Sequence, residues 1–251
     1  MRVTLNGYVA ADEDLWIYDW YGYPAFGPGT IRQALADNPP GEELVLEVNS
    51  YGGSVWAGAE IYSVLRGSET PTRAEIQSLA ASAASYLVAG CDEVWISPVA
   101  EMMVHLPATV TDGDRNAHRN SIHILDSIEE SILNAYEIKS AGKRSRDELA
   151  RMMHNETWLT AQDALDAGLV DGILYQDTVD PKTVVNAVGG GIHALAGSLG
   201  VPDIAKLRDE YFKTHTKIGE MCYDILDTEG KSVSQVAMEV CVWLRDKLKG
   251  M

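Results

Sequence analysis

The chain has 251 residues, of which 46% are hydrophobic and 23% are charged. That composition fits one large folded domain, or one domain with an appendage, and excludes an intrinsically disordered protein. Its 37 acidic side chains outnumber 20 basic ones, and the resulting net charge of -17 argues against binding to the phosphate backbone of nucleic acids.

The first 70 residues predict strands and helices joined by turns rich in glycine and proline. We expect strands at residues 3–10, 15–18 and 44–48, and helices at residues 30–36 and 55–65. Residues 20–29 are expected to form a loop, and residues 49–53 a glycine turn after the third strand. Gly67 is expected to end the second helix.

The stretch 74–90 predicts a strand that passes into a helix with no loop between them. Its junction is made of alanine and serine, and Ser82 falls beside backbone amides that a helix cannot satisfy internally. Ser82 is therefore either a helix N-cap, with Ser85 bonding back to a carbonyl, or a supported nucleophile. Taken alone, the stretch favours the N-cap.

The next hundred residues continue the alternation of strands and helices. We expect strands at 93–96 and 102–105, a long helix at 114–141, and further helices opened by Ser145 and Thr160. This rhythm predicts an α/β fold of βαβ units, with a mostly parallel sheet covered by helices. The first half of the long helix is too polar to be buried in a monomer, so we expect it to project and pack on a neighbour.

The character of the sequence changes after residue 177. Glycines gather at 189–191 and 197–200, and residues 233–248 carry apolar side chains at helical spacing. The predicted organisation is therefore a domain at 1–177 and an appendage at 178–251, made of a linker and a helical segment.

Cysteines and targeting signals predict a cytoplasmic protein. The three cysteines are far apart and lack CxxC spacing, which favours reduced thiols. Residues 1–10 do not resemble a secretory signal, and no apolar run is long enough to span a bilayer. The six histidines show no paired ligand spacing, so we expect neither a metal nor a cofactor. Residues 140–143 match SxxK, yet they straddle a predicted helix end.

Three of the predicted strands end in chemically useful groups: the pair Gly52-Gly53, Ser82 and His105. Because ligands of open parallel sheets bind at the carboxyl ends of the strands, we expect these groups to converge. The backbone amides of Gly53 and Ala83 would then form an oxyanion hole. A histidine could take the serine proton, and a carboxylate could hold that histidine in the required tautomer.

Four motifs, in the same order along the chain, resemble those of the caseinolytic, ClpP-type serine peptidases. The family's N-S-P-G-G turn corresponds to residues 49–53, and its A-A-S-M nucleophile segment to residues 80–83. Its M-I-H-Q-P strand end corresponds to residues 103–107, and its carboxylate with the following L/M-S-A-x-E-A-x-x-x-G-L-V/I-D to residues 156–171. The resemblance spans roughly residues 5–175, and an ordered set of motifs is far more specific than one motif.

The resemblance implies the ClpP/crotonase-like βαβ superhelix and a serine endopeptidase. It makes Ser82 the nucleophile and His105 the general base, with the amides of Gly53 and Ala83 as the oxyanion hole. The third triad member falls on Glu156, where the family usually has aspartate.

Three further positions bear on the match to the family pattern. Asp163 is the alternative to Glu156 as the triad carboxylate. Tyr51 replaces a proline and Ala83 a methionine, although only the backbone of position 83 is used.

The variant motifs resemble the phage-encoded branch of the family, whose members cut scaffold proteins during capsid maturation inside the prohead. The resemblance to this branch implies a protein or peptide substrate, such as a phage scaffold or capsid protein. The long helix from Asp114 resembles the family's helix that interlocks subunits, which implies a ring-shaped homo-oligomer. Trimming near residues 189–200 is a further expectation.

Other interpretations stay open at this point. They are a housekeeping subunit fed by an unfolding AAA+ ATPase, a catalytically inactive scaffold of the same fold, and a crotonase-like acyl-CoA enzyme. The C-terminal appendage and the variant motifs speak against the ATPase-dependent subunit.

Overall fold

The computed structural model describes residues 1–175, 206–207 and 211. The chain divides into two compact units, Met1–Val201 and Pro202–Met251, and residues 1–175 lie in the first. The boundary predicted at residue 177 and most of the predicted appendage lie outside the described residues, so both remain predictions.

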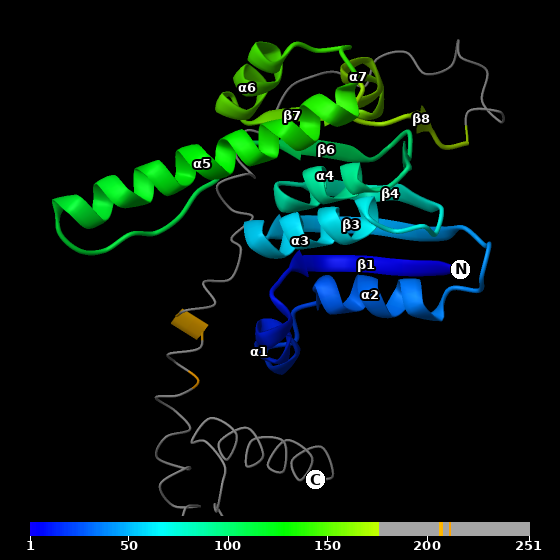
Figure 1. Ribbon diagram of the computed structural model, residues 1–251, viewed down its shortest axis with the longest axis horizontal. Coiled ribbons are helices and arrows are strands. Elements are labelled where there is room, and N and C mark those ends of the chain that lie inside the picture. The colour runs from blue at the N-terminus through cyan, green and yellow to red at the C-terminus, as the bar shows by residue number, and fades with distance from the viewer. Residues whose placement is uncertain (176–205, 208–210, 212–251) are drawn as a thin grey trace, which may run out of the picture. The chain divides into compact units, whose positions relative to one another are not determined.

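The elements of the described part alternate as the sequence predicts (Figure 1). In chain order they are β1 (Arg2–Val9), η1 (Asp12–Asp14), α1 (Leu15–Trp20), β2 (Ala25–Phe26), α2 (Pro28–Asp37), β3 (Leu44–Gly53), α3 (Val55–Arg66), β4 (Thr72–Ala81), α4 (Ala83–Leu87), η2 (Val88–Gly90), β5 (Glu93–Ile96), β6 (Glu101–Val104), α5 (Arg115–Ser140), α6 (Arg146–His154), β7 (Thr157–Thr160), α7 (Ala161–Ala167) and β8 (Gly172–Ile173).

Within the described residues the strands form one eight-stranded sheet. Six strands follow the order β2-β1-β3-β4-β5-β8, and the other two branch off it, with β6 beside β4 and β7 beside β6. Strand β4 is forked: residues 73–76 pair with β5, and residues 79–81 pair with β6. All pairs are parallel except β6 with β7. The fork places the carboxyl end of β4 between the ends of β3 and β6, where the functional groups are predicted from the sequence.

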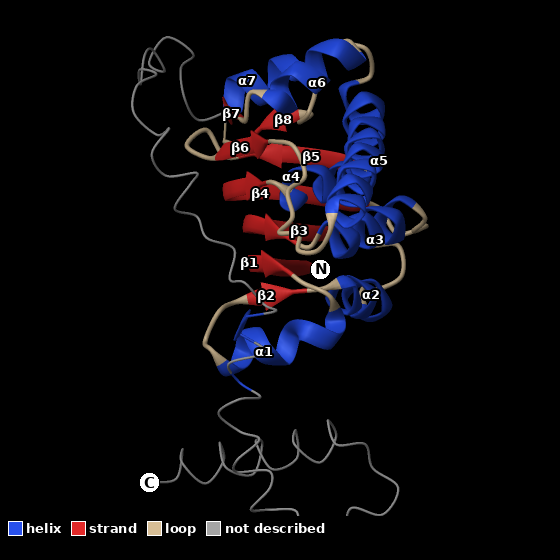
Figure 2. Ribbon diagram, turned by 90° about the vertical axis from the view of Figure 1, so that its left-hand side faces the viewer, coloured by secondary structure: helices blue, strands red, loops and turns tan. Residues whose placement is uncertain are grey.

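Helices α2, α3 and α5 lie on the same side of the sheet (Figure 2). The core between these helices and the sheet is apolar and includes Leu5, Leu46, Ile61 and Ile76, each fully buried. The sheet positions that alternate with the core residues are more polar, and Arg2 forms ion pairs there with Glu47 and Glu75. This alternation is what a sheet with one covered face requires.

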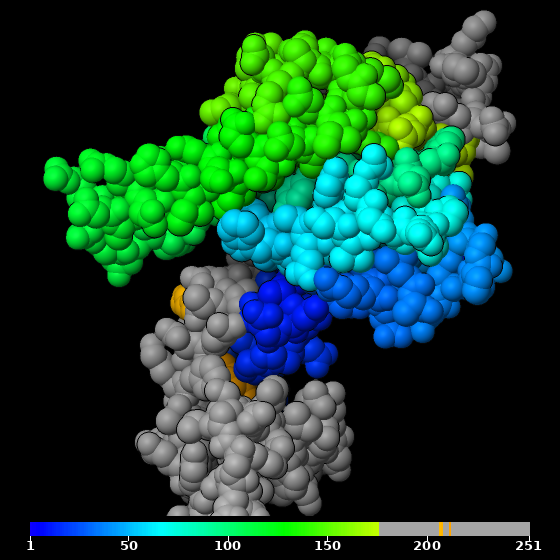
Figure 3. All heavy atoms as spheres, in the orientation of Figure 1, coloured from blue at the N-terminus to red at the C-terminus, as the bar shows by residue number. Residues whose placement is uncertain are grey.

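Helix α5 changes character along its length. Its buried residues are Ile132, Leu133, Ala135, Tyr136 and Ser140, and no residue from 115 to 131 is buried. The first half extends away from the sheet, and the space-filling view shows it as a rod beside the body of the unit (Figures 1 and 3). The expected projection is confirmed, whereas packing on a neighbour stays a prediction.

Several predicted helix ends are confirmed by their caps. Helix α3 ends at Gly67, and α7 ends at Gly168 in the left-handed conformation. Ser145 and Thr160 both form capping boxes, at the starts of α6 and α7. No helix in the described part of the chain is long and apolar enough to cross a membrane.

The strand predicted at residues 15–18 is wrong, because Leu15–Trp20 forms helix α1. Its aromatic and β-branched residues favour a strand by propensity. Three acidic residues precede it, however, and form η1, where negative charge complements the N-terminus of a helix. The carboxylate of Asp12 also accepts the amide of Gly29 at 2.9 Å, which anchors the turn.

Two neighbouring predictions need smaller corrections. The turn predicted at 49–53 belongs to strand β3, because β1 resumes pairing with it after a bulge, through Tyr8 with Gly52 and Val9 with Gly53. The loop predicted at 20–29 contains β2, and α2 begins earlier than expected, with Pro28 in its first turn.

Candidate active site

Ser82 occupies the sharp turn between β4 and α4. Its backbone has φ 54° and ψ -125°, a conformation that costs a residue with a side chain about 1–3 kcal/mol. The Ser82 hydroxyl makes no cap hydrogen bond to the helix; its Oγ lies 2.7 Å from Nε2 of His105. The N-cap interpretation is therefore wrong for the Ser82 side chain, although Ser85 does donate to the Ser82 carbonyl as that interpretation expects, at 2.6 Å.

His105 follows the last residue of β6, the strand that pairs with the carboxyl end of β4, and its side chain contacts Ser82. The Ser82 amide donates to the carbonyl of Met103 at 2.9 Å, so the turn is fastened to the strand that carries the histidine. Burial lowers the pKa of His105 below its ordinary value of 6.5, while the charge of Glu156 acts in the opposite direction. The imidazole is thus neutral at pH 7 and able to accept the serine proton.

Gly52 and Gly53 bring β3 close to this turn. A side chain on Gly52, whose φ is 84°, would place its Cβ 2.7 Å from both the Ala83 nitrogen and the Ser82 Cβ. A side chain on Gly53, whose φ is 150°, would meet the Val9 carbonyl at 2.2 Å. Only glycine fits at either position, because an L-residue rarely adopts these φ values and has no space here.

Two backbone amides at this end of the sheet are the predicted oxyanion donors. The Ala83 amide belongs to the first residue of α4, and such an amide has no partner within its own helix. The Gly52 amide donates to the Ser50 hydroxyl at 3.1 Å. Of the two glycines, Gly53 therefore stays the candidate for the second donor.

Glu156 lies between α6 and β7 in the left-handed conformation, with φ 47°, and it is exposed. No hydrogen bond joins its carboxylate to His105, and its influence on that histidine is the electrostatic one described above. The alternative carboxylate, Asp163, accepts from the amide and hydroxyl of Thr160 at 3.2 and 2.6 Å in the cap of α7. The structure thus brings Ser82 and His105 into contact and leaves both carboxylates out of it.

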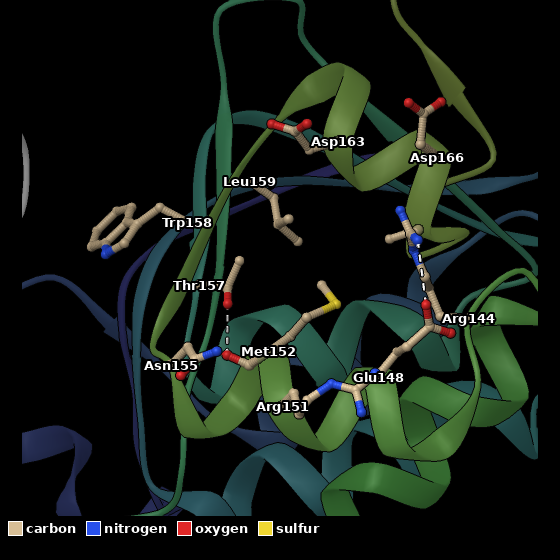
Figure 4. Close-up of a pocket in the computed structure, with 11 residues that line it drawn as sticks. Arg144, Glu148, Arg151, Met152, Asn155, Thr157, Trp158, Leu159, Asp163 and Asp166 are labelled. Carbon is tan, nitrogen blue, oxygen red and sulfur yellow. Dashed lines mark hydrogen bonds and ion pairs between the residues drawn. The ribbon is translucent and has the colours of Figure 1, made fainter. Parts of the chain in front are cut away.

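A sizeable cavity in the described part of the chain does not contain this pair. It has a volume of about 580 Å³ and lies between α6, β7 and α7. Its charged lining comes from Arg144, Glu148, Arg151, Asp163 and Asp166, and its one lining hydroxyl, that of Thr157, donates to the Met152 carbonyl. Figure 4 shows Trp158 turned away from the other lining residues. No histidine lines the cavity to activate the Thr157 hydroxyl, so the cavity is not the candidate active site.

The remaining motifs have structural explanations. The Ser140 hydroxyl of the SxxK match is buried, donates to the Ala167 carbonyl at 2.7 Å and accepts the Arg144 amide at 3.0 Å. It joins α5 to α7. Within residues 1–175 and the few described beyond them, no group of three or more His, Cys, Asp or Glu side chains could hold a metal ion.

One polar contact at the site could not be expected from the sequence. The Tyr136 hydroxyl lies 2.6 Å from the Ser85 hydroxyl. The two residues are 51 positions apart, and no local pattern signals the contact.

A serine hydroxyl bonded to a neutral imidazole, at the start of a helix and beside two glycines, is the arrangement of serine hydrolases. The comparison with protein families agrees: the family model described as Clp protease matches residues 32–177. The chain belongs to the Clp protease family.

Individual relatives align over little more than half of this chain. It is 31% identical over 140 residues to the ATP-dependent Clp protease proteolytic subunit 1 of Chlamydia abortus, and 30% identical over 141 residues to that of Chlamydia muridarum. Each alignment covers 54% of this chain and 72% of the relative. The ATP-dependent Clp protease proteolytic subunit of Pleurastrum terricola is 27% identical over 139 residues.

Proposed function

We propose that the chain is a serine endopeptidase in which Ser82 is the nucleophile and His105 the general base. The observation that carries this proposal is the 2.7 Å contact between the Ser82 Oγ and the His105 Nε2. The low pKa of His105 supports it, because only a neutral imidazole can accept a proton.

The proposed reaction has two halves. The Ser82 Oγ attacks the peptide carbonyl while its proton passes to the His105 Nε2, and the carbonyl oxygen becomes an oxyanion held by the amides of Gly53 and Ala83. The tetrahedral intermediate expels the amine, which takes the proton from His105, and leaves an acyl-serine. A water molecule then attacks the acyl group, again with His105 as the base, and releases the acid and Ser82.

Glu156 is proposed as the third member of the triad. Its negative charge favours the imidazolium that forms when His105 takes the proton, and this influence is present without direct contact. In serine hydrolases the carboxylate also fixes the histidine tautomer, and a hydrogen bond tightened on substrate binding would supply that role.

A serine-directed fluorophosphonate tests the catalytic pair. We expect it to label the wild-type chain at Ser82, and both Ser82→Ala and His105→Ala to lose the label and the peptidase activity. Ser78→Ala and His118→Ala are matched controls, because Ser78 is an exposed serine on β4 and His118 an exposed histidine on α5. An unlabelled, correctly assembled wild-type protein would instead support an inactive scaffold.

We further propose a phage role, in which the protease cuts scaffold or capsid protein during prohead maturation. The variant motifs at 78–85 and 156–158 and the long C-terminal sequence after residue 177 support it. Coexpression with the scaffold protein of the same genome should give cleaved scaffold with the wild type and intact scaffold with Ser82→Ala. Mass spectrometry of the same samples would show whether the chain is cut near residues 189–200.

The names of the relatives favour a second candidate, a subunit that works with an unfolding AAA+ ATPase. The matched proteins from Chlamydia are described as ATP-dependent. A folded substrate degraded only with an added ATPase and ATP would support this candidate, and scaffold cleavage without ATP would favour the phage role. Consumption of an acyl-CoA thioester would contradict both.

A further inference from the structure

The Ser82 carbonyl is held from the helix side by a short chain of hydroxyl groups. The Ser85 hydroxyl donates to it at 2.6 Å, and the Ser85 amide also donates to it at 2.9 Å. The Tyr136 hydroxyl lies 2.6 Å from the Ser85 Oγ. Ser85 and Tyr136 are each only 2% exposed, so water does not compete for these bonds.

The directions of the bonds follow from counting protons. The Ser85 hydroxyl has one proton, and it is committed to the Ser82 carbonyl. The Tyr136 hydroxyl must therefore donate to the Ser85 Oγ. Burial raises the pKa of Tyr136, so this phenol keeps its proton across the working pH range.

Fixing the Ser82 carbonyl also fixes the Ala83 amide. The two groups belong to one planar trans peptide unit, in which the C=O and N–H point in opposite directions. A carbonyl held toward Ser85 consequently directs the Ala83 N–H away from α4. The bare Cα of Gly52 leaves space on the other side of this amide, since a Cβ there would lie 2.7 Å from the Ala83 nitrogen.

We propose that Ser85 and Tyr136 are positioning residues that orient the Ala83 amide as an oxyanion donor. This inference rests on the proposed peptidase function and deepens it. Neither side chain touches substrate: Tyr136 acts through Ser85, and Ser85 acts through the peptide that joins Ser82 to Ala83. Because Tyr136 belongs to α5, the hydroxyl chain also connects the long helix to the strained turn of the nucleophile.

Kinetics of two conservative variants test the proposal. Ser85→Ala leaves the Ser82 carbonyl with the backbone bond alone, and we expect kcat to fall about tenfold with KM nearly unchanged, a smaller loss than removal of an oxyanion donor causes. Tyr136→Phe should lower kcat about threefold. The double variant should be no slower than Ser85→Ala, because the two residues act in series.

Two variants control for the loss of a buried hydroxyl group. Ser140→Ala removes a buried serine hydroxyl that donates to the Ala167 carbonyl, and Tyr86→Phe removes a buried tyrosine hydroxyl that donates to the Val55 carbonyl. Both should keep the wild-type kcat. Affinity for a peptide aldehyde, whose adduct carries an oxyanion-like oxygen, should fall with kcat in the test variants and stay constant in the controls.

An unchanged kcat in Ser85→Ala, or an equal loss in the controls, would refute the positioning role while leaving the peptidase function intact. Hydrogen exchange of the peptide covering 82–90 decides the same question without turnover. Exchange should be faster in Ser85→Ala and Tyr136→Phe than in Ser140→Ala, whose substitution lies outside this peptide. An inactive wild type with this exchange pattern would refute the proposed function and support the positioning role, and an unaltered pattern would refute the positioning role.

Discussion

At the scale of single residues, His105 determines the expected dependence of the rate on pH. Protonated imidazole cannot accept the Ser82 proton, so kcat/KM falls as the pH drops through the pKa of His105. Burial lowers that pKa below 6.5, and the acid limb should therefore have its inflection below pH 6.5. A profile measured with a fluorogenic peptide checks this, and an inflection above 6.5 would contradict it.

Substitution of Glu156 should shift this inflection in a defined direction. The carboxylate raises the pKa of His105, so Glu156→Gln removes the opposing influence and moves the inflection to still lower pH. The plateau rate should also fall, roughly tenfold, because the imidazolium loses a stabilising charge. Asp163→Asn is the control, since that carboxylate is occupied in the cap of α7 and the pH profile should not move. A Glu156→Gln profile identical to that of the wild type would exclude Glu156 from the triad.

Gly52 provides a test of the close approach between β3 and the nucleophile turn. A Cβ at this position would push directly on the Ala83 nitrogen and the Ser82 Cβ, and we expect Gly52→Ala to lower kcat about a hundredfold. Gly41→Ala separates contact from backbone strain, because Gly41 has a similar φ of 81° and no atom within 4 Å of its added Cβ. Gly41→Ala should lower the stability of the protein and leave kcat unchanged. Equal activity losses in the two variants would contradict this explanation.

The proximity of Ser82 and His105 could be predicted from the sequence, because parallel strands deliver their carboxyl ends to one edge and the motifs fall at those ends. The distances between the side chains could not be predicted. Glu156 is placed by the left-handed turn before β7, and no residue type in that turn reveals how far its carboxylate lies from His105. The bond between Ser85 and Tyr136 joins two elements through tertiary packing alone.

At the scale of elements, segments with their own start and stop signals were predictable, and segments decided by their neighbours were not. Helix α3 and strand β5 carry their own start and stop signals, and both are confirmed. Helix α1 is only six residues long, so propensity at 15–18 is outweighed by the acidic turn before it. The end of β3 depends on its partner strand, because β1 continues to pair with the glycine segment.

The cap of α6 offers a stability test at this scale. The Ser145 Oγ accepts the Glu148 amide at 3.3 Å, and Glu148 accepts the Ser145 amide at 2.8 Å. Ser145→Ala should reduce the free energy of unfolding by about 1 kcal/mol. Ser131→Ala is the control, because that exposed serine lies within α5 and only bonds back to the Ser127 carbonyl. Urea unfolding at one protein concentration measures both, and equal losses would exclude a specific capping contribution.

At the scale of the whole molecule, the projection of the outer half of α5 is not explained by packing within the described unit. It carries Ile122 and Ile124 with 57% and 45% of their surfaces exposed, on a helix segment with no buried residue. Exposed apolar side chains on a projecting helix favour contact with another protein surface. The proposed ring-shaped homo-oligomer would supply that surface from further copies of the chain.

The double variant Ile122→Glu/Ile124→Glu tests this assembly. Burying two carboxylates in an apolar contact is costly, so light scattering at micromolar concentration should report the mass of a single chain, where the wild type gives a multiple of it. Val99→Glu is the matched control, because Val99 is 86% exposed and lies outside α5, between β5 and β6. If α5 supports the nucleophile turn through Tyr136, the dissociated variant should also lose peptidase activity while remaining folded by circular dichroism. A variant that keeps the oligomer mass would show that the outer half of α5 does not form the interface, and a monomeric wild type would refute the ring.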